Sequence, residues 1–84
     1  MTHATKHLYF AVFILTQIEI NLPSLEWGVD LLLRNIIGED AWELLINGEN
    51  ITVGSEFAYM VNNNLIPFTR VGKNSTNWAL YRRV

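Results

Sequence analysis

The chain contains no cysteine, and this absence limits both its chemistry and the ways in which it can be stabilised. It excludes a disulfide framework and any reaction that depends on a thiolate. It is also compatible with a reducing compartment, so we expect a cytoplasmic protein. The 84 residues are enough for one domain, 1–84, which has to hold its interior together by hydrophobic packing alone.

Residues with catalytic or metal-binding chemistry are scarce. The only histidines, His3 and His7, stand four positions apart without a third ligand at a suitable spacing, which predicts no metal site. The five glycines are isolated, so no phosphate-binding loop is present. The serines occur in turn and cap contexts rather than in a nucleophile motif. We therefore expect a protein that is not an enzyme and that uses neither a metal ion nor another cofactor.

The chain also lacks an apolar run long enough to cross a bilayer. Its most apolar stretch, residues 8–20, is interrupted by Thr16, Gln17 and Glu19. No small-residue cleavage pattern follows this stretch, so it does not predict a secretory signal. We expect no membrane partner.

Hydrophobic residues, in contrast, make up 50% of the chain, which is rich for a domain with little interior. The stretch 8–20 is β-prone and apolar on two faces when read at period two, which predicts a central strand, although a buried helix would show the same pattern. Helices on one side of a sheet would leave the second face of this strand uncovered. We therefore predict a homodimer formed through an interface that includes Tyr9, Phe13 and Leu15.

The remaining segments predict an α+β fold in which two helices pack on a small antiparallel sheet. Apolar spacing from Leu25 to Ile36 predicts a helix over 24–37, closed by Gly38. Asn47-Gly48 favours a hairpin over 41–53, while Asp40 and Glu43 resemble a capping arrangement that would make this segment helical instead. A short helix over 55–64 and a wing-like hairpin over 65–84 complete the chain.

Charge is divided unevenly along the chain. Residues 1–54 hold two basic and seven acidic residues, for a net charge of −5, whereas residues 55–84 hold four basic residues against Glu56, for a net charge of +3. An acidic mean argues against a nonspecific polyanion binder, but a basic C-terminal third allows a local surface that contacts phosphate.

The order of a short helix over 55–64 and a hairpin over 65–84 resembles the recognition helix and wing of winged helix-turn-helix domains. In that family the helix enters the major groove and the wing contacts phosphates or the minor groove. The resemblance implies a nucleic-acid-binding regulator. The residues that it brings forward as nucleic-acid contacts are Glu56, Tyr59, Asn62 and Asn63 on the helix and Arg70, Lys73, Asn74, Arg82 and Arg83 on the hairpin.

A second hypothesis, from a different class, is a protein-interaction module such as a small inhibitor or accessory protein that docks on a larger assembly. It depends on Trp27, Trp42 and Trp78, since tryptophans surrounded by charge are typical of interface hot spots. Binding of nucleic acid would separate the two hypotheses.

Overall fold

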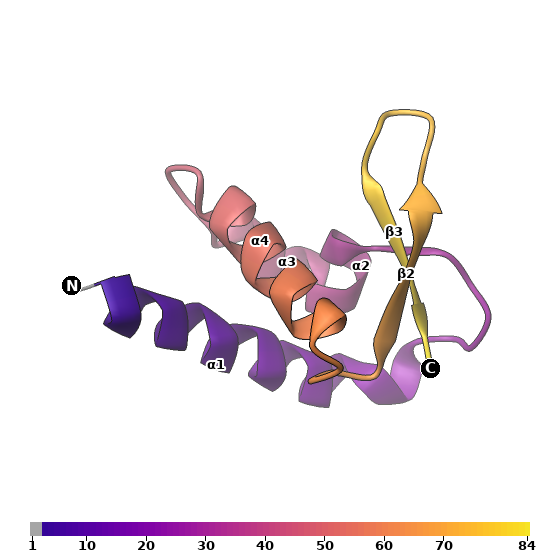
Figure 1. Ribbon diagram of the computed structural model, residues 1–84, viewed down its shortest axis with the longest axis horizontal. Coiled ribbons are helices and arrows are strands. Elements are labelled where there is room, and N and C mark those ends of the chain that lie inside the picture. The colour runs from indigo at the N-terminus through magenta and orange to yellow at the C-terminus, as the bar shows by residue number, and fades with distance from the viewer. Residues whose placement is uncertain (1–2) are drawn as a thin grey trace.

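The computed structural model describes residues 3–84, and their side chains from Leu8 onward, so the side chains of His3 and His7 lie outside the described part. Helices and a small sheet alternate along the chain (Figure 1). The elements in order are α1 (His3–Asn21), a 3-10 turn η1 (Leu22–Ser24), β1 (Leu31–Leu32), α2 (Leu33–Ile37), α3 (Glu39–Glu43), α4 (Glu49–Asn62), β2 (Phe68–Lys73) and β3 (Ala79–Arg83).

The stretch 8–20 forms most of helix α1, so the predicted central strand is wrong and the helix that the apolar pattern left open is present. Phe10, Ile14 and Ile18 recur every four residues and are almost fully buried, as expected for one face of a helix. That face packs against α2 and α4. The period-two reading failed because this segment is apolar on nearly every side, so sequence spacing alone could not select the strand or the helix.

The predicted helix over 24–37 is also corrected, because only its last residues are helical. The chain passes through η1, turns at Gly28 with a φ of 71°, and pairs with β3 through Leu31 and Leu32 before α2 begins. A left-handed glycine interrupts a helix, and the backbone groups of β1 find their partners in the sheet. The expected end of the helix is confirmed: Gly38 has a φ of 98°, and its N–H donates to the Arg34 carbonyl.

The predicted hairpin over 41–53 is replaced by helix. Asn47 and Gly48 both adopt positive φ, as a tight hairpin turn would require, but they join α3 to α4. The Glu49 side chain accepts a hydrogen bond from the Ile46 N–H at 2.9 Å and so holds this turn. Helix α4 therefore starts six residues before the predicted start at Ser55, and the apolar spacing of Val53, Phe57 and Val61 runs along its buried face.

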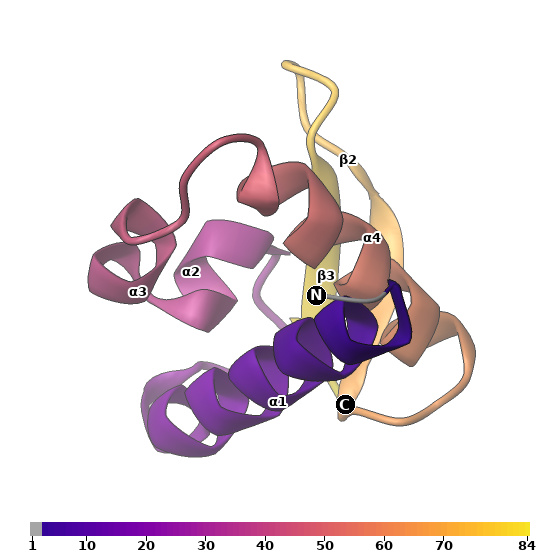
Figure 2. The ribbon, with the colours of Figure 1, turned by 90° about the vertical axis from the view of Figure 1, so that its left-hand side faces the viewer.

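The C-terminal hairpin is confirmed, and with it the α+β class. Strands β2 and β3 pair antiparallel, and β1 adds to the other edge of β3, so the strand order is β1-β3-β2. The register shifts between Arg70 and Gly72, where an extra residue bulges from β2. The hairpin projects beyond the helices, and Figure 2 shows it beside α4.

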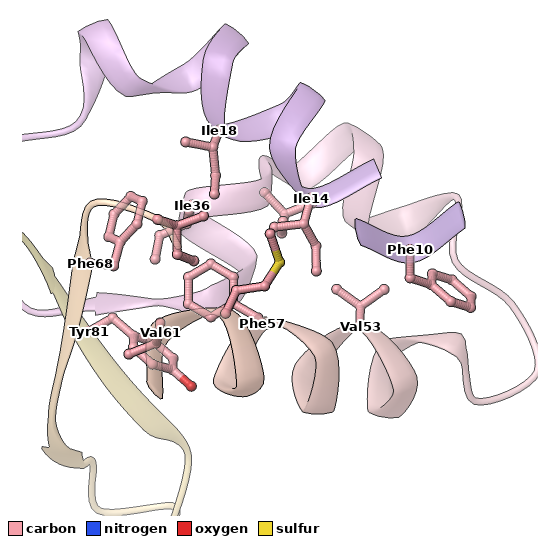
Figure 3. Packing of buried hydrophobic residues seen from close by; sticks show 12 residues of the cluster. Phe10, Ile14, Ile18, Ile36, Val53, Phe57, Val61, Phe68 and Tyr81 are labelled. Atoms are coloured by element: carbon pink, nitrogen blue, oxygen red, sulfur yellow. The ribbon is translucent and has the colours of Figure 1, made fainter. Parts of the chain in front are cut away.

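One hydrophobic core joins the helices to the sheet, and Phe57 of α4 lies at its centre (Figure 3). Its ring centroid lies 4.7 Å from that of Tyr81 on β3, in an edge-to-face arrangement, and 5.8 Å from that of Phe68 on β2. Ile14 of α1 and Ile36 of α2 close the opposite side of this cluster. The inner face of α4 is therefore fixed by three different parts of the fold.

Asn21 connects the end of α1 to the end of α2. Its side-chain amide donates to the carbonyls of Ile36 and Ile37, at 3.0 and 2.8 Å. The last carbonyls of a helix have no partner within the helix, so a side-chain donor from elsewhere satisfies them. Asn21 is partly buried, so water is a poor substitute for these bonds.

Replacing Asn21 with alanine should therefore lower the free energy of unfolding by about 1–3 kcal/mol, since two carbonyls lose their donor. Urea denaturation followed by circular dichroism would measure the change. Asn62→Ala, at an exposed position of α4, is the matched control and should change stability by less than about 0.5 kcal/mol. Equal stability of the two variants would contradict the role assigned to Asn21.

Candidate nucleic-acid interface

The exposed face of α4 forms one side of the candidate interface. Because Val53, Phe57 and Val61 face the core, the opposite side of the helix is left open to solvent. Its exposed residues follow the helical repeat and are Ile51, Ser55, Tyr59 and Asn62. The predicted contacts Tyr59 and Asn62 thus lie on the outer surface.

Two other residues predicted on this helix have different surroundings. Asn63 follows the last residue of α4, and its side-chain amide donates to the Tyr59 carbonyl at 2.8 Å, which closes the helix end. Glu56 is only 7% exposed and lies on the buried side of α4. The expectation that Glu56 faces a nucleic acid is therefore wrong.

Strand β2 supplies the cations of the candidate interface. Arg70 and Lys73 are both exposed, on the strand that contacts α4. Residues 57–84, which include the whole hairpin, contain no acidic residue. The hairpin therefore presents positive charge that is not opposed by a carboxylate of its own.

The structure gives Arg82 and Arg83 partners within the protein. The Arg82 Nε lies 2.6 Å from the Asp30 Oδ1. The Arg83 Nη1 donates to the carbonyls of Leu22 and Leu25, at 3.0 and 2.9 Å, and its guanidinium carbon lies 4.1 Å from the centroid of the Trp27 ring. Both arginines therefore fasten the segment before β1 to strand β3.

Asn74 also has a structural position, in the turn of the hairpin. Its Oδ1 accepts hydrogen bonds from the Thr76 N–H, the Thr76 hydroxyl and the Trp78 N–H, at 3.1, 2.9 and 2.9 Å. One side-chain oxygen thus organises the turn between β2 and β3. Of the predicted hairpin contacts, Arg70 and Lys73 remain as cations with exposed side chains, and neither makes a bond of this kind to the described part of the chain.

A groove of about 430 Å³ opens between α4, the helices before it and the hairpin. Its wall is mainly apolar and includes two tryptophans, Trp42 of α3 and Trp78 immediately before β3. Arg34 and Arg70 contribute charge to the wall. The remaining lining residues are Leu32, Leu33, Asn50, Ile51, Gly54, Ser55, Ala58, Ala79 and Tyr81.

Sequence reasoning did not find this groove, because its residues come from six separate elements, β1, α2, α3, α4, β2 and β3. Trp42 and Trp78 were singled out as aromatic anchors, but the sequence holds no signal that brings them to one place. Arg34, which also lines the groove, lies with its Nε 3.4 Å from the Glu39 Oε1, and Asp30 pairs with Arg82. The grouping depends on how α4 packs against the sheet.

The three residues predicted at the dimer interface differ in their exposure to solvent. Tyr9 and Leu15 are exposed on the outer side of α1, at 54% and 47% of their surface. Phe13 is partly buried and packs against the core. The helix thus divides the side chains that the strand interpretation had placed on a single face.

Comparisons with protein-family models, with curated proteins and with solved structures found no match for this chain. Among the residues described, no helix has both the length and the apolar character needed to cross a membrane. In the same part of the chain, no three histidine or carboxylate side chains gather where they could share a metal ion.

Tyr81 lies in the wall of the groove and belongs to the core, since only 3% of its surface is exposed. Burial raises the pKa of its phenol above the ordinary value of 10.0, and the nearby positive charge of Arg70 partly opposes this increase. The neutral phenol is therefore the form that the folded protein favours.

This raised pKa predicts a loss of stability in alkaline solution. The contribution of neutral Tyr81 is fully present below the ordinary tyrosine pKa and is lost as the pH rises through the higher pKa of the folded state. Urea unfolding between pH 8 and about pH 11 should show a steeper decline for the natural chain than for Tyr81→Phe, which keeps the ring and removes the ionisable group. Parallel declines would show that Tyr81 does not carry this dependence.

Proposed function

We propose that the chain is a small nucleic-acid-binding regulator of the winged helix-turn-helix type, in which α4 and the β2–β3 hairpin form the contact surface. The observation that carries the proposal is the position of Arg70 and Lys73 on a strand that packs beside the open face of α4. Cations that flank an exposed helix can hold a phosphate backbone while the helix approaches the bases.

The order of the elements supports the same proposal. A chain of this family begins with a helix and has a further helix before its recognition helix, whereas the sequence predicted a strand over 8–20 and a hairpin over 41–53. The structure has α1 in the first place and α3 in the second. This order of elements supports the proposal.

The charges of the hairpin determine how such binding should respond to salt. Each phosphate that a cation neutralises releases counterions, so the logarithm of the affinity falls with the logarithm of the salt concentration by about 0.7 to 0.9 per contact. Since the whole chain has a net charge of −2, the binding has to depend on a few local contacts. Removing one of them should be visible in the slope.

We expect Arg70→Gln and Lys73→Gln each to weaken binding to a nucleic acid and to flatten the salt slope by about 0.7 to 0.9. Fluorescence anisotropy with labelled duplex and single-stranded DNA, over a series of salt concentrations, measures both quantities. The matched control is Arg82→Gln, because Arg82 is paired with Asp30 and should contribute little to the slope.

Failure to bind either form of DNA at low salt would overturn the proposal. The protein-interaction hypothesis would then take its place, and a specific observation supports it. Exposed apolar side chains gather around the turn from α3 to α4, where Leu44, Ile46 and Ile51 are between 63% and 77% exposed. A protein partner that covered this turn would remove apolar surface from water.

We also propose that the protein is a homodimer that pairs through the outer face of α1. This face carries an apolar stripe of Leu8, Val12 and Leu15 at i, i+4 and i+7, flanked by Tyr9 and Ile20. Each of these side chains is between 47% and 64% exposed. Glu19 is the one charged residue among residues 8–21 of the helix.

The size of the stripe supports a second copy as the partner. If each of its side chains leaves on the order of 100 Å² exposed, one copy offers roughly 500 Å² and a symmetric pair roughly 1,000 Å², the lower limit for a specific interface. A two-fold axis would place the stripe of one α1 against that of its partner. The pair would carry two copies of the candidate nucleic-acid interface.

Leu15→Glu should therefore produce a monomer, since a charge would be buried at the centre of the pair. Light scattering after size exclusion, at micromolar concentration, distinguishes the two states. Leu65→Glu is the control, because Leu65 is exposed but does not belong to the stripe on α1, so its substitution should leave a dimer intact. A natural chain that is monomeric at every concentration would overturn this proposal.

A further inference from the structure

The floor of the groove beside α4 is formed by a glycine that the packing of the helix does not require. Gly54 lies in the middle of α4, where glycine destabilises a helix by about 1 kcal/mol relative to alanine. A Cβ at this position would meet only the Leu33 side chain, at 3.9 Å, which is an ordinary contact. The fold would therefore accept a side chain, and its absence keeps the groove open between Trp42 and Trp78.

We infer that this groove binds single-stranded nucleic acid, taking an unstacked base against its tryptophans and the adjacent phosphate at Arg70. The inference rests on the proposed function and names the form of nucleic acid that the site prefers. Proteins that bind single strands combine aromatic platforms for bases with cations that follow the backbone. The groove brings both kinds of group together.

The wall of the groove offers a suitable contact for the base and for the phosphate of a nucleotide. Trp78 is about half exposed, so a base can reach the face of its ring. Asn50 and Ser55, both exposed on α4, offer donors and acceptors for the edge of a base. Arg70 supplies positive charge at the hairpin side, in the strand that also carries Lys73. Tyr81 and the leucines of β1 and α2 give the base an apolar surrounding.

The groove side of α4 carries short side chains. Helix α4 contains no arginine, lysine or glutamine, and Asn50 is the asparagine that it contributes to the groove wall. Between Ile51 and Ala58 the groove-lining residues are Gly54 and Ser55. These short side chains leave space beside the helix for an unstacked base.

The volume of the groove agrees with this occupant. At about 430 Å³ it lies within the roughly 300–1,000 Å³ that is usual for small-molecule sites, which is room for a base and its sugar. The charge of the groove also favours an anionic ligand, because the two charged residues in the wall, Arg34 and Arg70, are both basic. Arg34 already has Glu39 as a counterpart, with its Nε 3.4 Å from the Glu39 Oε1, so Arg70 is the guanidinium that a neutral apolar peptide would leave without one.

The test compares a 12-nucleotide thymidine strand with a duplex of about 12 base pairs, using the full chain at low salt. Binding is measured by anisotropy and by the indole N–H signals in a nitrogen–proton NMR spectrum. We expect the strand to bind at least tenfold more tightly than the duplex. The signals of Trp42 and Trp78 should shift, whereas that of Trp27, which stacks on Arg83 outside the groove, should not.

Two variants locate the site. Gly54→Leu fills the floor of the groove and should weaken strand binding by tenfold or more, whereas Gly54→Ala, which improves the helix but adds one methyl group, should change it less than threefold. Trp78→Ala removes an exposed stacking surface and should also weaken binding by about tenfold or more. Circular dichroism and urea unfolding verify that each variant is folded.

The outcomes separate this inference from the function on which it rests. Tighter binding of the duplex, or strand binding that Gly54→Leu and Trp78→Ala leave unchanged, overturns the groove as the site while nucleic-acid binding stands. Binding of neither probe overturns both. Shifts confined to Trp27 would place the contact outside the groove, beside Arg83, and would also overturn the groove.

Discussion

The burial of α4 against both α1 and the sheet is the constraint on which the rest of the structure depends. Phe57 contacts Phe68 and Tyr81 of the hairpin, while Val53 and Val61 extend the same buried stripe along the helix. Because an α-helix repeats every 3.6 residues, fixing one face determines the other. The exposure of Ser55 and Tyr59, and the groove beside them, are consequences of a core that lies on the opposite side of the helix.

The C-terminal half was the more predictable part of the fold, for a local reason. The hairpin 65–84 follows from turn-forming residues between two β-prone segments, and it depends little on the rest of the chain. The stretch 8–20 contained no such decisive signal, since a segment that is apolar all round fits a strand or a helix. What selects the helix is the packing of Phe10, Ile14 and Ile18 against α2 and α4, which is tertiary information.

The incorrect predictions for the middle of the chain have the same origin. Asn47-Gly48 does adopt the positive φ values that its sequence predicts, but the same turn geometry also connects two helices. The hairpin predicted over 41–53 placed Val53 in a strand, yet Val53 lies with Phe57 on the buried face of α4. Propensity is thus overridden where a longer helix buries more apolar surface. Gly28 lies inside the helix predicted over 24–37, whereas its positive φ begins the extended path to β1.

The candidate site was predicted only in part, because composition does not distinguish a structural cation from one that can bind a ligand. The sequence suggested four basic residues at the C-terminus, and the structure uses Arg82 and Arg83 to hold the Asp30 and Leu22–Leu25 region against β3. Those contacts position β1, which completes the sheet on which α4 packs. The two arginines that line the groove, Arg34 and Arg70, are separated by 36 positions in the sequence.

Gly54 relates the stability of α4 to the shape of its outer face. A helix that is held on its inner side by Val53 and Phe57 can tolerate a residue that weakens it by about 1 kcal/mol, since packing and not intrinsic propensity supplies most of its stability. Tertiary packing on one side of the helix therefore permits a locally unfavourable residue on the other. The same core that orients α4 allows its exposed face to remain hollow, and this is why the groove lies beside the best-packed helix of the fold and not at a loosely packed edge.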